Sequence, residues 1–411
     1  MTPPASLADC ESLDRCDPFA ETRQQFRLKP EVIYLDGNSL GALTHASIAR
    51  TRAMIEDEWG RDLIRSWNVH GWFDLPLKLG ARIAPLIGAA REEVLVADST
   101  SVNLFKLASA AMMARGKRHR IVTELGNFPT DLYVLQGLAA LSSGAIEVVA
   151  VPREHIVASI DSATFLVVLT HVHYKTAELF DMVAVTREAH AHGARILWDL
   201  SHSVGALETD LHAAGADFAV GCTYKYLNGG PGSPAFLYVR GDLQDGHTPG
   251  LAAWMGHTAP FEFSDNFAPA AGMARFRGGT PSMISFASLE GALDVWEGVE
   301  LHEVRRKSEA LSELFIARLD ALTGCDLSLA SPREIARRGS HVALRHPQGY
   351  ELMQALIARG VIGDFRAPDV VRFAFAPLYL RYVDVWQAVT ILSEVLDGLS
   401  RTEHLRRNAV T

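Results

Sequence analysis

The sequence predicts an α/β protein with a large, mostly parallel sheet that carries helices on both faces, followed by a smaller α+β unit. Short apolar runs alternate with helical patterns between residues 93 and 240, which is typical of parallel strands joined by helices. A glycine-rich segment, Gly221 to Pro234, follows one of these strands and carries Lys225. With 411 residues, the chain can bury a large core and form two domains that share an interface.

The elements of the large sheet follow from hydrophobic periodicity. Strands are expected at Val94 to Ala97, Ile121 to Glu124, Ile146 to Val151, Phe165 to Thr170, Arg195 to Asp199, Ala216 to Val220 and Ala235 to Val239. The helices expected between them are Asn103 to Ala114, Asp131 to Leu141 and Val183 to His192. This pattern predicts a seven-stranded type of sheet.

The segment before this sheet is less regular. Residues 1 to about 30 are polar and predict no regular structure. Val32 to Leu35 predicts a strand, and Ser47 to Trp59 predicts a helix. The aromatic-dense segment Ser66 to Phe73 either packs on the core or lines a pocket, and packing is favoured.

After the sheet, residues 241–285 are rich in glycine, proline and aromatic residues and predict a long ordered loop or a domain boundary. The helices expected beyond it are Phe286 to Val299, Leu301 to Leu322, Tyr350 to Arg359 and Val383 to Leu399, with strands at His341 to Leu344 and Val371 to Phe375. We therefore expect an amino-terminal segment, 1–50, that packs with the small domain, a large domain, 51–285, and a small domain, 286–411.

Composition limits the classes of function. A content of 48% hydrophobic and 21% charged residues is that of a soluble globular protein, and a net charge of −9 argues against a nucleic-acid-binding surface. The basic cluster Arg115 to Arg120 is interpreted as a solvated loop. The four cysteines are too few and too scattered for a disulfide framework, so reduced thiols are expected. With no secretory signal and no long apolar run, we expect a cytoplasmic protein without a membrane segment.

Lys225 lies between a buried strand and a glycine-rich turn, at a strand exit where α/β proteins place their chemistry. It is either a solvated surface charge or a lysine that forms a Schiff base with an aldehyde cofactor. Asp199 favours the second interpretation, because it ends a strand 26 residues earlier. In enzymes that use pyridoxal phosphate, a carboxylate faces the pyridine nitrogen and keeps it protonated.

Two strand-to-helix junctions supply further candidates. The segment Asp98 to Asn103 places the hydroxyls of Ser99, Thr100 and Ser101 near a helix amino terminus, which suits a phosphate or serves as a plain N-cap. At the next junction, Phe128 is placed to stack on a flat ring. Asp131 either caps the helix or reaches a ring hydroxyl.

Other polar residues leave alternatives open. The loop Asp36 to Gly41 is either a binding loop or an ordinary turn. His171, His173 and His202 follow strand ends, but a metal site is disfavoured because carboxylates or cysteines at ligand spacing are missing nearby. His202 is expected to bond a phosphate or to tune Asp199. Arg372 stands in an apolar strand, where it either holds a substrate carboxylate or forms a structural salt bridge.

Five motifs together resemble the kynureninase family, in particular its bacterial form, over residues 20 to 400. They are Tyr34-Leu-Asp-Gly-Asn-Ser-Leu-Gly41, Asn127-Phe-Pro-Thr-Asp131, Leu169-Thr-His-Val-His-Tyr-Lys175, Trp198-Asp-Leu-Ser-His-Ser-Val-Gly205 and Gly221-Cys-Thr-Tyr-Lys-Tyr-Leu-Asn-Gly-Gly-Pro-Gly232. The last motif is the most specific, because related class V aminotransferases and cysteine desulfurases share the Asp and Lys but lack it.

The resemblance implies a fold-type I pyridoxal 5'-phosphate enzyme that cleaves kynurenine hydrolytically to anthranilate and alanine during tryptophan breakdown. It also implies a homodimer whose active sites are each completed by the neighbouring subunit. The implied catalytic residues are Lys225, Tyr224 and Asp199. The implied cofactor-binding residues are these three with Thr100, Ser101, Phe128, Pro129, Thr130, Asp131, Thr170 and His202, and with Trp254 and Thr280 of the second subunit.

The resemblance also assigns the substrate. Arg372 matches the arginine that binds the substrate carboxylate, and Trp67, Gly279 and Asn38 fall where the family binds the rest of kynurenine. The small and apolar groups at Trp67 and Gly279 resemble bacterial members that prefer kynurenine over its 3-hydroxy derivative.

Two rival interpretations remain at this stage. A cysteine desulfurase needs a mobile nucleophilic cysteine, and Cys325 is the candidate, although the residues around it lack the expected pattern. A binding protein that kept the fold without catalysis would be favoured by loss of the lysine or the arginine. Both residues are present.

Overall fold

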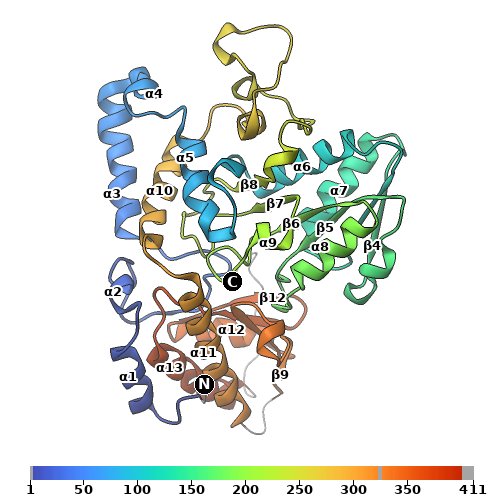
Figure 1. Cartoon of the computed structure of the whole chain (residues 1–411). Coiled ribbons are helices and arrows are strands. Elements are labelled where there is room, and N and C mark those ends of the chain that lie inside the picture. Colours follow the sequence, from blue (N-terminus) through green and yellow to red (C-terminus); the bar gives the residue numbers. More distant parts are fainter. Residues whose placement is uncertain (1–2, 323–325, 400–411) are drawn as a thin grey trace.

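The computed structural model describes residues 3–322 and 326–399. At its centre lies a seven-stranded sheet with the order β2-β8-β7-β6-β5-β3-β4 (Figure 1). The strands are β2 (Val94–Val96), β3 (Arg120–Glu124), β4 (Glu147–Val151), β5 (Thr164–Thr170), β6 (Arg195–Asp199), β7 (Phe218–Gly221) and β8 (Phe236–Val239). Strand β8 pairs antiparallel with both of its neighbours, and the other four pairs are parallel. The predicted mostly parallel α/β sheet is confirmed.

Helices cover both faces of this sheet, as the alternation along β5 shows. Leu166 and Val168 belong to the apolar cluster with the helices α6 (Thr100–Met113) and α7 (Pro129–Leu141). Val167 and Leu169 belong to the cluster on the opposite face with α8 (Met182–Ala191) and α9 (Leu211–Ala214). Successive side chains of a strand point to opposite faces, so both faces of β5 are buried.

A second, antiparallel sheet occupies the lower half of Figure 1 and has the order β12-β13-β10-β9. Its strands are β9 (Ser328–Leu329), β10 (His341–Arg345), β12 (Asp364–Arg366) and β13 (Val370–Ala374), and the helices around it are α11 (Leu301–Asp320), α12 (Gly349–Ala358) and α13 (Tyr382–Leu399). The short strand β1 (Ile33–Tyr34) pairs in parallel with β11 (Val361–Ile362). The amino-terminal segment is thereby joined to the carboxy-terminal part of the chain.

The expectation that residues 1 to about 30 are irregular is wrong. Helices α1 (Leu7–Arg15) and α2 (Ala20–Arg23) form there, and α1 begins at the N-cap Ser6. Short helices gain most of their stability from tertiary packing. Here α1 packs against α13, and the Asp14 carboxylate accepts the backbone N–H groups of Tyr382 and Val383 at 2.7 and 3.1 Å.

The predicted helix at Ser47 to Trp59 is α3 (His45–Ala53), and it continues as a π-helix, Met54–Asp62. Two unpredicted helices follow, α4 (Ser66–Val69) and α5 (Leu75–Ile83). The aromatic segment packs as expected, because the rings of Trp67 and Trp72 meet edge to face with their centroids 5.7 Å apart. The Trp72 indole also donates to Glu58 at 2.6 Å.

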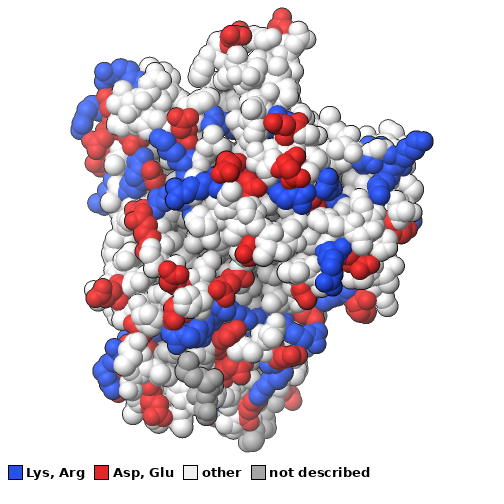
Figure 2. Space-filling model, in the orientation of Figure 1, with Lys and Arg blue, Asp and Glu red and all other residues white. Residues whose placement is uncertain are grey.

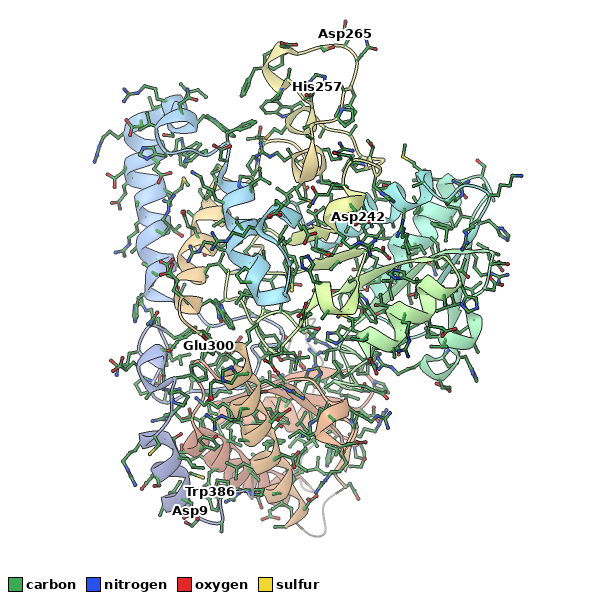
Figure 3. All side chains as sticks on the ribbon, viewed as in Figure 1. Asp9, Asp242, His257, Asp265, Glu300 and Trp386 are labelled. Carbon is green, nitrogen blue, oxygen red and sulfur yellow. The ribbon has the colours of Figure 1, made fainter. Side chains whose placement is uncertain are left out.

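Residues 241–282 form a long loop, as predicted, with the four 3₁₀ turns Gly241–Leu243, Trp254–Gly256, Pro260–Glu262 and Gly272–Phe276. Its central part projects from the top of the molecule in Figure 1, and Figure 3 labels His257 and Asp265 on it. Helix α10 (Met283–Leu293) then packs on α3.

Charges of both signs are interspersed over the face that Figure 2 shows. Within residues 3–322 and 326–399, no helix combines the length and the apolar character that crossing a bilayer needs.

Candidate functional site

The carboxyl ends of β5, β6 and β7 meet at one edge of the large sheet, where parallel α/β sheets bind ligands. A cavity of about 150 Å³ opens there. It is lined by Ser99, Thr100, Ser101, Phe128, Thr130, Asp131, Thr170, Tyr174, Asp199, Ser201, His202, Tyr224 and Lys225. Eleven of the residues singled out from the sequence are thus brought together from five separate segments.

Lys225 extends from the turn after β7, and its Nζ lies 2.9 Å from Nε2 of His202. Burial, and then the charge of Lys225, hold the pKa of His202 well below its ordinary value. The imidazole is therefore neutral and accepts an N–H from the lysine. Nδ1 of His202 is buried and has no hydrogen-bond partner among the described residues. The lysine is thereby oriented without being neutralised by a carboxylate.

Asp199 ends β6 and is 4% exposed. It accepts the backbone N–H of Ser201 at 2.7 Å. Burial raises the pKa of Asp199, while Ser201 and Lys225 act in the opposite direction. No ion pair involves Asp199 in the described parts of the chain, so its carboxylate is free to accept a cationic or N–H group of a ligand.

Asp131, in the first turn of α7, is the second buried carboxyl group of the cavity. It accepts from Thr170 Oγ1 at 3.1 Å and from Asn127 Nδ2 at 3.2 Å. Burial, and then repulsion from Asp199, raise the pKa of Asp131 well above its usual value. Two carboxyl groups with different partners therefore share one small cavity.

The amino terminus of α6 forms another wall. Ser99 is the N-cap, and its hydroxyl accepts the backbone N–H of Val102 at 3.4 Å. Thr100 and Ser101 occupy the first turn, where backbone N–H groups lack intrahelical partners and the helix dipole is positive. The N-cap interpretation is confirmed. The adjacent hydroxyls line the cavity, and their binding of a phosphate stays a prediction.

The loop Asp36 to Gly41 docks onto the lysine segment. Gly41 donates its N–H to the Tyr224 carbonyl at 2.7 Å, and a Cβ on Gly41 would lie 2.1 Å from the Lys225 carbonyl oxygen. A residue with a side chain cannot approach so closely. In the same loop, Asn38 is fully buried, with neither side-chain polar atom bonded within the described residues.

Arg372, on β13, is 1% exposed and is held by a salt bridge to Asp364 of β12. Its Nε donates to Asp364 at 2.7 Å, Nη2 donates to Asp364 and to Ser39, and Nη1 donates to the carbonyl of Tyr174. The structural salt bridge considered from sequence is therefore present. One of the two N–H groups on Nη1 is left for a further acceptor.

Several predicted residues lie outside this cavity in the single chain. They are Pro129, Trp254, Thr280, Trp67, Asn38, Gly279 and Arg372. Pro129 begins α7 and lies between two lining residues. Trp254, on the projecting loop, is 38% exposed, and its ring centroid lies 5.8 Å from that of Phe261. Trp67 packs near Met54 and Ala287.

Gly279 and Thr280 line a neighbouring cavity of about 380 Å³. This cavity shares Ser99, Thr100 and Tyr224 with the smaller one, so the two are contiguous. A Cβ on Gly279 would meet no atom within 4 Å. The space beside Gly279 is therefore open to a ligand.

The histidines predicted not to bind a metal are engaged otherwise. Nδ1 of His171 lies 2.9 Å from the Ser203 hydroxyl, and burial lowers the pKa of His171 to about 3. His173 donates from Nε2 to the carbonyl of Gly126 and accepts the N–H groups of Lys175 and Thr176 at Nδ1. Residues 3–322 and 326–399 contain no group of three side chains placed to hold a metal ion.

Tyr174 and Ser201 line the cavity but were not predicted from the sequence. The rings of Tyr174 and Phe128 meet edge to face, with their centroids 5.3 Å apart. Both residues could have been predicted, because they lie within the sequence motifs at the ends of β5 and β6. Cys10, Cys16 and Cys222 are free thiols, and Cys325 lies outside the described residues.

Comparison with solved structures identifies the fold. An apo cysteine desulfurase from Thermococcus onnurineus NA1 superimposes with a TM-score of 0.79 at 19% identity, covering 92% of this chain and 98% of that one. The cystine C-S lyase C-DES in complex with cysteine persulfide gives a TM-score of 0.75 at 17% identity, covering 89% and 98%. The expected fold-type I architecture is confirmed.

Comparison with known sequences identifies the family. The kynureninase C-terminal domain model matches residues 304–392. The kynureninase of Pseudomonas fluorescens is 50% identical over 396 residues, which cover 95% of each chain. That of Burkholderia mallei (strain SAVP1) is 50% identical over 409 residues, covering 97% of this chain and 98% of the relative. This chain therefore belongs to the kynureninase family.

Proposed function

We propose that this protein is a kynureninase that hydrolyses the Cβ–Cγ bond of L-kynurenine to give anthranilate and L-alanine, with pyridoxal 5'-phosphate as cofactor. It cleaves 3-hydroxykynurenine less well and acts in tryptophan degradation. The identity of 50% to curated kynureninases over nearly the full length supports this proposal. The observation that carries it is the placement of an amine, Lys225, and a carboxylate, Asp199, on the walls of one cavity without an ion pair between them.

The residues of the small cavity fit this cofactor. A buried carboxylate suits a pyridinium N–H, an aromatic face at Phe128 suits a planar ring, and the amino terminus of α6 suits a phosphate. The unpartnered Nδ1 of His202 provides one further polar contact. The proposed binding set is completed by Thr100, Ser101, Pro129, Thr130, Asp131, Thr170 and Tyr224.

When bound here, pyridoxal phosphate supplies an electron sink that stabilises carbanions at Cα and Cβ of an amino acid. Lys225 takes the proton from the substrate Cα through Nζ. Its neighbour His202 does not compete for that proton, because its pKa lies far below that of an ordinary imidazole. His202 therefore positions the lysine.

Tyr224 is proposed to return a proton to the substrate Cβ. Repulsion from the Cys222 side chain, and then burial, raise the pKa of the Tyr224 phenol above its ordinary value. The hydroxyl therefore stays protonated at neutral pH and is available as a donor. Its ring lies beside the lysine, with Nζ 5.9 Å from the ring centroid.

The substrate carboxylate is proposed to bind the remaining N–H of Arg372. The salt bridge to Asp364 fixes the plane of the guanidinium, which sets the direction of that N–H. Asn38 offers a buried amide without a hydrogen-bond partner among the described residues, in the loop whose Ser39 hydroxyl accepts from Arg372. Trp67 and the open space at Gly279 are proposed to bind the aromatic end of kynurenine.

The protein is proposed to act as a cytoplasmic homodimer that binds neither nucleic acid nor membrane, with Trp254 and Thr280 completing the site of the partner. Large apolar side chains on the projecting loop support this assembly. Phe261 is 65% and Phe263 is 74% exposed in the single chain, and such groups mark protein interfaces. The division into the units 1–50, 51–285 and 286–411 is proposed with it.

The test is a turnover assay on purified, cofactor-loaded protein. We expect a yellow protein that releases fluorescent anthranilate and an equal amount of alanine from L-kynurenine. The Lys225→Ala variant serves as the inactive control and should lose the visible absorbance of the bound cofactor.

Cysteine is the second substrate in this assay, because the structural neighbours include a cysteine desulfurase. Release of alanine and sulfur from cysteine, without anthranilate from kynurenine, would refute the proposal.

A further inference from the structure

A second cavity, of about 370 Å³, opens at the amino-terminal edge of the large sheet. It is lined by Ala111, Ala114, Arg115, Arg118, Phe165, His190, Gly193, Ala194, Arg195 and His247. Phe165 and Arg195 stand at the beginning of β5 and β6, whose last residues, Thr170 and Asp199, line the cofactor cavity. The two cavities therefore lie at opposite ends of the same strands.

Arg118 is held in this cavity without a carboxylate. Its Nη1 donates to the carbonyls of Thr164 and His192 at 2.8 and 2.7 Å. A Cβ on Gly193 would lie 2.5 Å from Nη2 of Arg118, so the guanidinium lies directly against this glycine. Neutral carbonyls orient the side chain but leave its positive charge uncompensated.

Arg115, three residues earlier in the loop after α6, shows the same pattern. Its Nη1 donates to the carbonyl of Met112 at 2.8 Å. In the described parts of the chain, neither Arg115 nor Arg118 takes part in an ion pair. Both belong to the basic cluster that the sequence alone assigns to a solvated loop. The cluster does lie in a loop, and these two half-buried arginines also line the cavity.

The buried carboxylate that contacts the lining residues Arg195 and His190 is already committed. Asp217 is fully buried, and it binds Arg195 at 3.0 Å, Arg240 at 3.2 Å and His190 at 2.7 Å. It also accepts the backbone N–H of Ile196 at 2.9 Å. Arg195 and Asp217 therefore balance each other, and the charges of Arg115 and Arg118 remain as an excess of two.

The rest of the wall is apolar or neutral. Ala111, Ala114, Phe165 and Ala194 contribute apolar surface. Burial lowers the pKa of His247, whose Nδ1 donates to the carbonyl of Leu243 at 2.8 Å. A volume of about 370 Å³ lies in the range of small-molecule sites.

We propose that this cavity is a second ligand site, which binds a small phosphate monoester between the guanidinium groups of Arg115 and Arg118. A phosphate monoester carries about two negative charges at neutral pH and so matches the excess of two positive charges. Its oxygens match the planar fork of an arginine, and its organic part contacts Phe165 and the alanines. The site is independent of the reaction at the other end of the strands.

The test is isothermal titration calorimetry of the cofactor-loaded protein with phenyl phosphate, in a buffer free of phosphate. The bound cofactor occupies the other phosphate site, and excess cofactor is removed before titration. We expect one phenyl phosphate per chain, with a dissociation constant of about 1 mM or lower. Phenol, the neutral counterpart, should not bind.

Matched variants locate the binding. The double variant Arg115→Gln, Arg118→Gln should weaken phenyl phosphate binding at least about tenfold, which corresponds to about 1.4 kcal/mol. Lys117→Gln is the control, because Lys117 is an exposed residue of the same basic cluster but does not line the cavity. It removes the same kind of charge and should bind as the parent does.

Loss of Arg118 removes two hydrogen bonds to carbonyls, so a second variant keeps both arginines. Ala114→Glu places a carboxylate in the cavity wall and should also weaken phenyl phosphate binding at least about tenfold. Absence of binding to the parent protein would overturn the proposal. Binding that is unchanged in the double variant and in Ala114→Glu would overturn it as well.

Discussion

Two buried carboxylates, Asp199 and Asp217, lie at opposite edges of the large sheet and have contrasting surroundings. Asp217 is 0% exposed and is satisfied by two arginines, a histidine and a backbone N–H. Asp199 is 4% exposed and accepts one backbone N–H, and burial raises its pKa.

The contrast separates a structural carboxylate from a functional one. A buried charge that folding must keep is given partners within the chain, as Asp217 is. A buried charge that the chain leaves without a cation is one that a ligand completes, as we propose for Asp199. Burial alone does not distinguish the two, but the number of partners does.

The largest expected effect is on catalysis in Asp199→Asn. Asparagine keeps the shape but removes the charge that holds the pyridine nitrogen protonated, at a cost of about 3–5 kcal/mol in transition-state stabilisation. We expect kcat/KM for kynurenine to fall by about 10²–10³-fold or more, with no loss of melting temperature in the cofactor-free protein. Steady-state kinetics and thermal unfolding measure the two effects. Turnover close to that of the parent would mean that Asp199 does not govern the cofactor ring.

For Asp217→Asn we expect a loss of stability and little change in activity. The substitution leaves Arg195 and Arg240 without their buried anion, and we expect the free energy of unfolding to fall by about 2–4 kcal/mol. The activity of each folded molecule should stay close to that of the parent. Chemical denaturation and active-site-normalised rates measure this, and a selective loss of activity at unchanged stability would reverse the roles assigned to the two residues.

Asp36 is another buried carboxyl group, and its Oδ1 has no hydrogen-bond partner among the described residues. Burial, and then the charge of Asp364, raise the pKa of Asp36 from 3.8 to about 7. The folded chain therefore holds a proton that the unfolded chain releases. The stability that this proton contributes is complete below about pH 4 and is lost as the pH rises through about 7.

The variant Asp36→Asn tests this dependence on pH. Relative to the parent, its free energy of unfolding should rise between pH 5 and pH 8, by about 3 kcal/mol. Denaturant titrations at several pH values measure the difference between the two proteins. A difference that stays constant across that range would show that Asp36 is ionised throughout.

The smallest expected effect concerns Gly279, where no charge is involved. A Cβ there meets open space, so Gly279→Ser should fold normally. The added hydroxyl can bond the hydroxyl of 3-hydroxykynurenine, at a gain of about 1 kcal/mol. We expect the ratio of kcat/KM for 3-hydroxykynurenine to that for kynurenine to rise about fivefold. An unchanged ratio would place the aromatic end of the substrate elsewhere.

Much of the large sheet could be predicted because its signals are local. The strand predicted at Arg195 to Asp199 coincides with β6, and β5 differs from its prediction by one residue. Polar residues directly after buried strands then predicted most of the cavity wall. Parallel strand ends meet at one edge, so proximity in space followed from position in the sequence.

The parts that could not be predicted depend on distant partners. Helix α5 contains Gly80, and glycine within a sequence disfavours the prediction of a helix. A Cβ on this glycine would lie 2.1 Å from the Val94 carbonyl, so it serves the close approach of helix and strand. The sequence could not decide whether Arg372 forms a salt bridge, for a similar reason. Its partner Asp364 lies on a second strand, and the pairing of these two strands is not revealed by the sequence.

The contact of α1 with α13 affects how the protein is synthesised. Asp14 caps a helix that begins at Tyr382, so this contact joins two segments near the opposite ends of the chain. During translation the first helix emerges early and finds its partner only after α13 has left the ribosome. A chain truncated anywhere before α13 therefore carries an undocked first helix that quality-control proteases can recognise.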